Sequence, residues 1–426
     1  MYRSLCLIAV LLLGPACTAP FDGPSGVCEA RRFEAIADTM WETYRTSDRA
    51  FVLGAMLEDG VIHAHPSAPP ANIRLVVGSG QPPEITRDEM PVHVALHWDE
   101  DTPMPDAGYP VFISMHGGGA FTAGENNEQW EIQQQRYPAV RGLYICPRSA
   151  RDTWDHWHEA HMFGLIDRLV RAVLLRDDID PDRIYLTGYC SGGNGVYQLG
   201  PILADRWAAV SATKAIHEGA PLANLRNCPI DIQWGEADPD TIDRPGLNRI
   251  AVDELYALHN ADRGGYTFRE IEHWRQGRFV NDKSTVGWLA RFTRDPYPQR
   301  VVWEQNGDVR ESSNPIRHQF YYLAIDADET FDGTGPDRII SELDRDANTV
   351  TLDVTGYDTV YLRLNDAMLD LDQKITVVCN GRVVFHGQVE RSVATLEKTL
   401  AERGDRRYMF PVELAIDVVE AGASGR

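Results

Sequence analysis

Residues 183–195, RIYLTGYCSGGNG, place a reactive side chain in a glycine-rich turn. A short β-prone apolar run at 184–186 precedes the turn and apolar residues at helical spacing follow it, so the pattern predicts strand, tight turn and helix. Gly188, Cys190 and Gly192 fit G-x-nucleophile-x-G, the turn that lifts one side chain off the end of a buried parallel strand. The thiol of Cys190 is therefore the predicted nucleophile.

The spacing of the glycines distinguishes Cys190 from its neighbour Ser191. If Ser191 were the nucleophile, a glycine would be required two residues earlier, where the chain has Tyr189. Glycines flank the central residue because that residue is strained and neighbouring backbones approach it closely. A glycine-rich loop that cradles phosphate, or an ordinary strand-to-helix turn, uses similar residues, so this motif alone leaves both alternatives open.

A second glycine-rich turn, HGGG at residues 116–119, follows the apolar run 111–115. Backbone N–H groups without side chains in the way suit a developing negative oxygen. We therefore expect the N–H groups of Gly117, Gly118 and Ser191 to form an oxyanion hole. A plain glycine turn is the alternative, but the position directly after a predicted buried strand favours the functional interpretation.

An acid and a histidine follow the thiol in chain order. Asp238 comes just after a predicted strand, where an acid that orients a catalytic histidine is expected, although Asp240 and Asp243 compete and a solvated acidic loop is the alternative. His273 lies at the end of the next predicted strand and is the predicted general base. Farther along, 276–279 reads Gln-Gly-Arg-Phe, and arginine cannot act as a base at neutral pH.

Aromatic and imidazole side chains crowd the loop after the predicted strand 143–146. From this loop and the other strand ends, five residues are predicted to line a substrate site: His116, Trp154, Trp157, His158 and His217. His158 and His161, three residues apart, are the strongest candidates for metal ligands. We predict that these rings form an aromatic wall that faces the substrate, and no metal site.

Strands and helices alternate between residues 91 and 295, which predicts right-handed crossovers and a doubly wound, mainly parallel sheet. Residues 18–90 are expected to add a helix at 29–45 and the first strands, one of them at 73–77. From about residue 296 to 426 the composition predicts a β-rich domain with one helix at 393–403. Within it, Asn380-Gly381 is the strongest short hairpin signal.

The chain of 426 residues carries 41 Lys and Arg against 63 Asp and Glu, a formal charge of −22. This sign opposes binding to nucleic acid or to an anionic membrane surface. The cysteines are scattered, without a C-x-x-C pair, so neither a zinc site nor a dense disulfide framework is predicted.

The N-terminus is typical of an export signal. Arg3 precedes the apolar run 5–13, and the small residues Ala16 and Cys17 follow it. We expect residues 1–17 to be a signal peptide, either simply cleaved or a lipoprotein signal with Cys17 as the lipid anchor. The protein is then periplasmic, attached to the outer membrane or secreted.

With these strand ends in order, the chain resembles the α/β-hydrolase superfamily. It is most similar to exported bacterial esterases described as polyhydroxybutyrate-depolymerase-like or dienelactone-hydrolase-like, and the dienelactone branch also has cysteine in a GYC-x-GG turn. The similarity covers most of residues 91–426. It rests on these stretches: FISMHGGGAF, WEIQQQRYP, YICPRSARDTWDHWHEAH, RIYLTGYCSGGNGVYQL, QWGEADPDTIDR and LRLNDAMLDLDQKITVVCNGRVVFHG.

The resemblance implies an ester hydrolase that needs neither metal nor cofactor and acts on a small-molecule or polymer ester. Cys190 would attack the carbonyl carbon, His273 would shuttle the proton and Asp238 would fix the imidazole tautomer. Two alternatives stay open: a catalytically silent binding protein of the same fold, and a peptidase of the same fold.

Overall fold

The structure is a computed structural model, and it describes residues 25–47, 54–58, 60–63, 89–99, 101–238, 242–277, 279–306, 317–327 and 336–418. The predicted signal peptide at 1–17, the predicted strand at 73–77 and Asp240 lie outside the described residues. Among the helices of the described ranges, none combines the length and hydropathy needed to cross a membrane.

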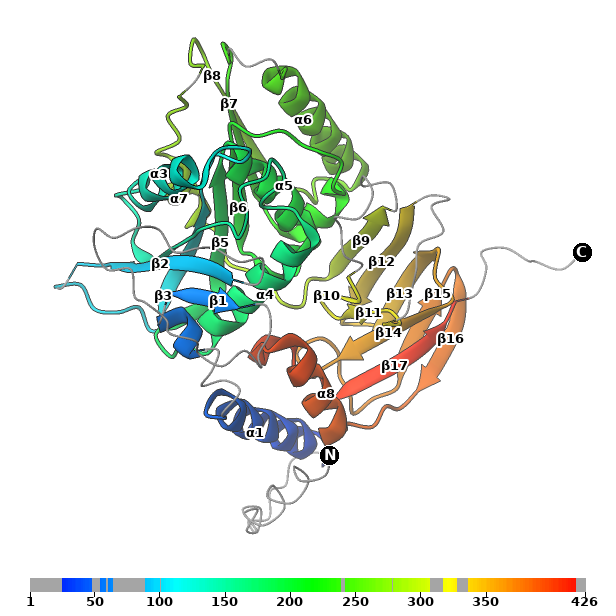
Figure 1. The fold of residues 1–426 in the computed structure, drawn as a ribbon. Coiled ribbons are helices and arrows are strands. Elements are labelled where there is room, and N and C mark those ends of the chain that lie inside the picture. The colour runs from blue at the N-terminus through cyan, green and yellow to red at the C-terminus, as the bar shows by residue number, and fades with distance from the viewer. Residues whose placement is uncertain are drawn as a thin grey trace, which may run out of the picture.

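One large sheet runs through the first part of the molecule in the order β1-β2-β4-β3-β5-β6-β7-β8 (Figure 1). The β1/β2 and β2/β4 pairs are antiparallel, and all pairs from β4/β3 onward are parallel. The predicted doubly wound, mainly parallel sheet is therefore confirmed. The strands are β1 Val61–His63, β2 Glu89–His97, β3 Tyr109–Met115, β4 Gly142–Pro147, β5 Ile179–Tyr189, β6 Ala209–Thr213, β7 Ile230–Gly235 and β8 Phe268–His273.

Helices cover both faces of this sheet because its central strands are apolar on both sides. Along β3, Val111 and Ile113 join one hydrophobic cluster and Phe112 joins another on the opposite face. The helices α4 (Ala160–Leu174), α5 (Ser191–Ile202) and α6 (Arg244–Ala261) pack on the first face. The helices α3 (Ala123–Gln134) and α7 (Thr285–Leu289) pack on the second.

The β-rich C-terminal part is also confirmed. It contains a five-stranded sheet, β16-β15-β13-β12-β9, and a four-stranded sheet, β10-β11-β14-β17. These strands are β9 Arg300–Asn306, β10 Gln319–Phe320, β11 Leu323–Ala324, β12 Pro336–Asp344, β13 Thr349–Thr355, β14 Thr359–Leu364, β15 Ile375–Cys379, β16 Arg382–Gly387 and β17 Val412–Asp417. The Asn380-Gly381 turn joins β15 to β16 as predicted, and both residues have positive φ.

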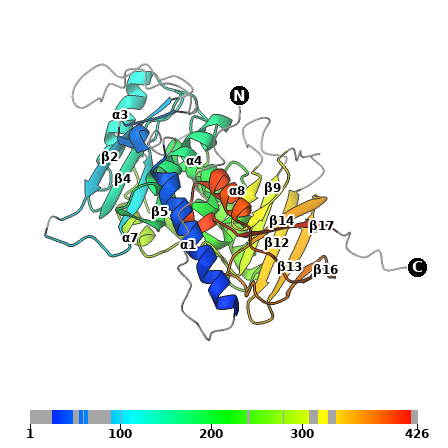
Figure 2. The ribbon, with the colours of Figure 1, turned by 90° about the horizontal axis from the view of Figure 1, so that it is seen from below.

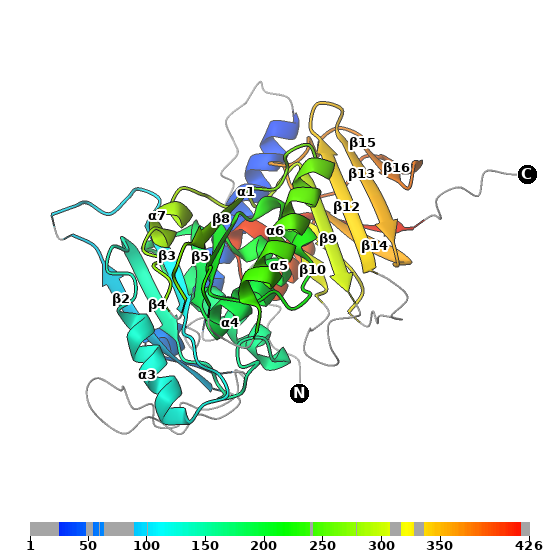
Figure 3. The same cartoon turned by 90° about the horizontal axis from the view of Figure 1, so that it is seen from above.

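The two parts share one apolar core. A single cluster of buried side chains includes Ile232 of β7 together with Trp303 of β9 and Leu362 of β14. Figure 3 shows β9 and β12 beside α5 and α6. The N-terminal helix α1 (Ser25–Arg45) packs on α8 (Val393–Arg403) through a smaller cluster, as Figure 2 shows from below.

A network of buried charges crosses the same boundary. Asp405, which follows α8, accepts from Arg294 at 3.0 Å and from Arg206 at 3.4 Å, and all three side chains are 1% exposed. Arg403 pairs with Asp205, and both of these are buried too. The buried charges are therefore paired rather than isolated, which is the condition under which a protein interior tolerates them.

Candidate active site

The turn after β5 holds Cys190 in a strained backbone conformation, with φ 58° and ψ −123°. Positive φ is costly for a residue with a Cβ, and such strain persists only where the surroundings enforce it. A Cβ on Gly188 would lie 2.1 Å from the carbonyl oxygen of Gly192, and a Cβ on Gly192 would lie 2.3 Å from that of Met115. The glycines of the motif are thus required for α5 to begin directly after the thiol.

This close packing predicts a large effect of adding one methyl group to the turn. We expect Gly192→Ala to lower the free energy of unfolding by about 2 kcal/mol or more, because backbone rather than a flexible side chain must move. Gly164 in α4 is the matched control, since a Cβ there meets no atom within 4 Å. Urea unfolding of both variants checks the prediction, and equal stabilities would contradict it.

The HGGG loop lies against the thiol residue. A Cβ on Gly117 would be 3.2 Å from the Cβ of Cys190, whereas Gly118 and Gly119 have positive φ of 109° and 121°. Buried Asn126 of α3 fixes the loop, because it accepts from the N–H of Gly119 at 2.9 Å and donates to the carbonyl of Gly119 at 2.8 Å. The loop backbone is therefore held beside Cys190 without intervening side chains.

His116 and Trp157 do not line a substrate site, contrary to the sequence prediction, because both are completely buried. His116 donates from Nδ1 to the carbonyl of Gly117 at 2.6 Å, and its Nε2 accepts from the N–H of Ser149 at 3.1 Å. The indole of Trp157 donates to the carbonyl of His116 at 2.8 Å. Burial lowers the pKa of His116 well below its ordinary value, so this neutral ring acts as a support for the glycine loop.

His156 contacts the turn more directly than any predicted wall residue. Its Nε2 lies 2.8 Å from the Oγ of Ser191, the first residue of α5, and both residues are buried. Burial, with a smaller contribution from Arg148, lowers the pKa of His156 to about 3. A neutral imidazole thus fixes the side chain of Ser191, whose N–H is a predicted oxyanion donor. This contact could not be predicted from the sequence, which shows His156 simply as one imidazole of the aromatic loop.

The other three residues that are predicted to line the substrate site differ in exposure and in contacts. Trp154 is 39% exposed and is available to a ligand. His158 is mostly buried and its Nε2 lies 3.2 Å from the carboxylate of Glu218, while His217 contacts the carbonyl of Ala220 at 2.8 Å. Across the described residues, no three His, Cys, Asp or Glu side chains are grouped so that they would hold a metal ion.

Asp238 does not orient His273, contrary to the prediction. Its side chain is 1% exposed and lies 3.6 Å from Arg244 and 3.9 Å from Lys214, so its charge faces two cations. The competing Asp243 instead caps α6, because its carboxylate accepts from the N–H of Gly246 at 3.0 Å. Neither acid is bonded to the imidazole.

His273 ends β8 and is held by an amide. Its Nε2 lies 2.9 Å from Oε1 of Gln233, whose own Nε2 donates to Asp231 at 2.7 Å and to Thr285 at 2.8 Å. Because both amide hydrogens of Gln233 are directed to those oxygens, the imidazole must donate from Nε2, which leaves Nδ1 unprotonated. Gln233 is the residue that the sequence analysis missed, and its only sign was a polar residue inside an apolar strand.

The thiol of Cys190 and the imidazole of His273 are not joined by a hydrogen bond. The described residues include no hydrogen bond between His273 and Cys190, and they show His273 bonded to Gln233 instead. Among Cys146, Cys190, Cys228 and Cys379, Cys190 is the one that is not buried.

The strand order, the crossover helices and the sharp turn after β5 define an α/β-hydrolase fold. The sequence matches no family model, and no curated protein matches it. Solved structures with similar folds include a thermostable esterase, with 19% identity and a TM-score of 0.36 over 48% of this chain and 60% of that chain.

Two further structures represent other hydrolases. FphF, a fluorophosphonate-binding serine hydrolase of Staphylococcus aureus, has 13% identity and a TM-score of 0.35 over 49% of this chain and 95% of that chain. Dipeptidyl peptidase 4 of Porphyromonas gingivalis has 11% identity and a TM-score of 0.35 over 48% and 34% of the two chains. These similarities assign no activity to this chain.

Proposed function

We propose that the protein hydrolyses carboxylic esters with Cys190 as the nucleophile. The observation that carries the proposal is the strained conformation of Cys190 at the carboxyl end of β5, with Gly117 directly against it. This arrangement places a partly exposed cysteine next to the backbone of the glycine loop, which Asn126 and Gln129 of α3 flank. It supports attack on a carbonyl carbon whose oxygen is then held by N–H groups of Gly117, Gly118 and Ser191.

His273 is the proposed base, and it acts through Nδ1. The imidazole takes the thiol proton, the sulfur bonds to the carbonyl carbon, and the alcohol leaves with that proton. Water, deprotonated by the same nitrogen, then attacks the thioester and releases the acid and the thiol. Gln233 replaces Asp238 as the group that holds the other ring nitrogen, in the manner of a Cys-His-amide set. Catalytic hydrogen bonds often close only when substrate is bound, and we propose this for His273.

The state of His273 predicts the pH dependence of the reaction. Burial lowers the pKa of His273 from its ordinary value of 6.5, and this outweighs the opposing effect of Asp282 and Asp231. A base works in its neutral form, so kcat/KM should rise with pH through a midpoint below 6.5. His273→Ala should lower kcat/KM by about 10²-fold or more and remove this limb.

p-Nitrophenyl acetate hydrolysis between pH 4 and 9 measures this prediction, with Asp238→Asn as the comparison. In Asp238→Asn, kcat/KM should still rise with pH as it does in the parent protein, because Asp238 contacts Arg244 and Lys214 rather than the imidazole. An unchanged profile in His273→Ala would remove His273 from the mechanism.

A second function, a binding protein without turnover, is favoured by one observation: His273 has no hydrogen bond to Cys190. The same assay decides between the two. Background rates that are equal in the parent protein and in Cys190→Ala would reject the esterase proposal and leave the binding function, which ligand-binding measurements would then test.

Export of the protein and the narrower similarity to depolymerase-like esterases are part of the proposal. The support for export is the apolar run 5–13 followed by Ala16 and Cys17. Fractionation of expressing cells tests it, and Cys17→Ser separates lipid attachment from simple cleavage, because it should release a membrane-bound form into the soluble fraction.

A further inference from the structure

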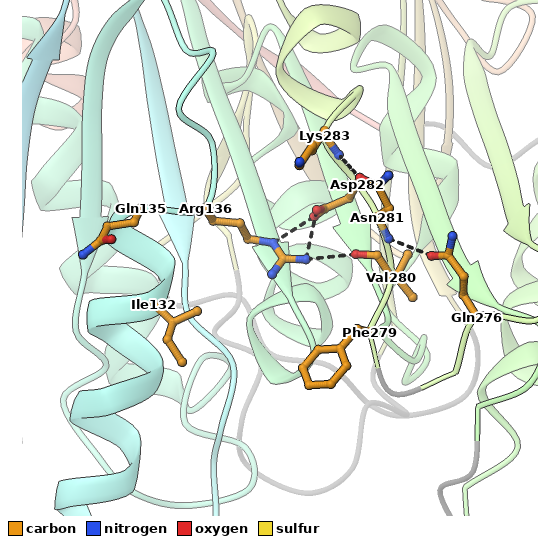
Figure 4. A pocket seen from close by; sticks show the side chains of 9 residues that line it. All are labelled: Ile132, Gln135, Arg136, Gln276, Phe279, Val280, Asn281, Asp282 and Lys283. Atoms are coloured by element: carbon orange, nitrogen blue, oxygen red, sulfur yellow. Dashed lines mark hydrogen bonds and ion pairs between the residues drawn. The ribbon is translucent and has the colours of Figure 1, made fainter.

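A pocket of about 600 Å³ opens between the end of α3 and the loop that follows β8 (Figure 4). Its lining residues are Ile132, Gln135, Arg136, Gln276, Phe279, Val280, Asn281, Asp282 and Lys283. The volume lies in the range that holds a drug-sized group. No predicted site residue belongs to this lining, so the pocket is not explained by the site described above.

Two contacts join the pocket to the residue before the thiol. The guanidinium carbon of Arg136 lies 3.5 Å from the ring centroid of Tyr189, and the N–H of Val280 donates to the hydroxyl of Tyr189 at 3.2 Å. Tyr189 precedes Cys190 directly in the chain. The pocket is therefore built against the same turn that carries the thiol.

The charges inside the pocket neutralise each other. Arg136 donates to the two carboxylate oxygens of Asp282 at 3.0 and 2.9 Å, and the hydroxyl of Tyr137 donates to the same carboxylate at 2.6 Å. Figure 4 shows this pair, together with the bond from Arg136 to the carbonyl of Val280. Lys283 is exposed to solvent. The buried part of the pocket therefore offers no uncompensated charge to an ionised ligand.

Apolar surface faces water on both sides of the opening. Ile132 of α3 is 56% exposed, and Phe279 of the loop after β8 is 80% exposed. In Figure 4 both side chains lie below the Arg136–Asp282 pair, on opposite sides of the view. Large exposed apolar side chains beside a pocket gain from burial against an apolar ligand.

We infer that this pocket binds the acyl group of the substrate, and that the preferred substrates are esters of bulky, neutral, apolar acyl groups. The inference rests on the proposed function for the identity of the acyl group. Tyr189, the residue before Cys190, contacts Arg136 and Val280 of the pocket lining. An acyl group bonded to the sulfur of Cys190 stays attached beside Tyr189 in the chain, whereas the alcohol departs. The pocket thus lies within reach of the part of the substrate that stays attached.

The test compares p-nitrophenyl acetate with p-nitrophenyl 4-phenylbutyrate, each rate divided by that of hydroxide-catalysed hydrolysis. The parent should prefer the phenylbutyrate at least about tenfold in kcat/KM. Phe279→Ala and Ile132→Ala should each lower kcat/KM for the phenylbutyrate by about five- to tenfold and leave the acetate unchanged. Ile250→Ala is the matched control, because Ile250 is a 64% exposed isoleucine of α6 outside the pocket lining.

The outcomes separate the two proposals. If the parent cleaves both esters but shows no preference, or if Phe279→Ala and Ile132→Ala behave as Ile250→Ala does, the acyl pocket is rejected and the esterase stands. If the parent cleaves neither ester, the proposed function fails, and calorimetry with 4-phenylbutyramide on Cys190→Ala tests the pocket alone. Binding that Phe279→Ala weakens about tenfold supports an apolar ligand there, and absence of binding overturns it.

Discussion

Cys190→Ala should reduce ester hydrolysis by at least about 10³-fold, to the rate left by the rest of the site. The reason is that no other free thiol with described surroundings is accessible, since Cys146, Cys228 and Cys379 are buried. Ser191 cannot substitute, because it is 2% exposed and its hydroxyl is bonded to His156. Steady-state kinetics with p-nitrophenyl acetate, and trapping of the acyl-protein by mass spectrometry, measure the effect.

Two further variants make this result specific. Cys190→Ser should keep part of the activity, because the hydroxyl occupies the same strained position but is a weaker nucleophile than a thiolate. Cys379→Ala removes a buried thiol from β15, far along the chain, and should keep full activity. A fully active Cys190→Ala would exclude cysteine catalysis.

Asp405→Ala should lower the free energy of unfolding by about 3–5 kcal/mol. The substitution removes the buried carboxylate that Arg206 and Arg294 share. Arg206 keeps Asp167 and Arg294 keeps Asp182, so each buried guanidinium group loses one of its salt-bridge partners. Removing one partner from a buried charge network is strongly destabilising. Asp38→Ala provides the comparison, because Asp38 is 64% exposed where it pairs with Arg406, and its loss should change stability far less. Urea titrations monitored by tryptophan fluorescence compare the two variants.

The stability that Asp405 contributes should depend on pH, and the direction of this dependence follows from its pKa. Burial opposes ionisation of Asp405, but Arg294 and Arg206 outweigh it and hold the pKa of Asp405 below its ordinary value. The folded-state pKa is then lower than the unfolded one. The stabilisation is complete above about pH 4 and is lost as the pH falls through the folded-state pKa. The difference in unfolding free energy between the parent protein and Asp405→Ala should therefore become smaller at acidic pH. A difference that became larger there would contradict a lowered pKa of Asp405.

Much of the fold was predictable because local patterns and global packing agree. The spacing of Leu165, Ile166 and Leu169 along the chain predicts one apolar helical face, and this is the buried face of α4. The glycines around Cys190 likewise predict the tight turn between β5 and α5. Boundaries are harder to predict. The sequence pattern predicts a helix at 128–137, but α3 begins at Ala123, because Thr122 and Glu125 form a capping box that starts the helix more than a turn earlier.

The partners of the site residues could not be predicted. His273 and Asp238 each follow a strand as expected, yet Arg244 and Lys214 attract the acid while Gln233 accepts from the imidazole. That choice depends on which side chains meet across neighbouring strands and helices, which spacing along the chain does not specify. The prediction that His116 and Trp157 contact a ligand is wrong for the same reason, because a run of imidazoles and indoles along the chain does not show which of these rings is buried in the core.

The apolar core extends from β7 into β9 and β14, so the β-rich half helps to support the sheet whose strand β5 leads into the Cys190 turn. A chain cut near residue 295 would take Asp405 away from Arg206 and Arg294, and it would expose the core side chains that β9 and β14 cover. The two halves should therefore melt cooperatively, and we expect the shortest stably folded version of this protein to extend at least through β17.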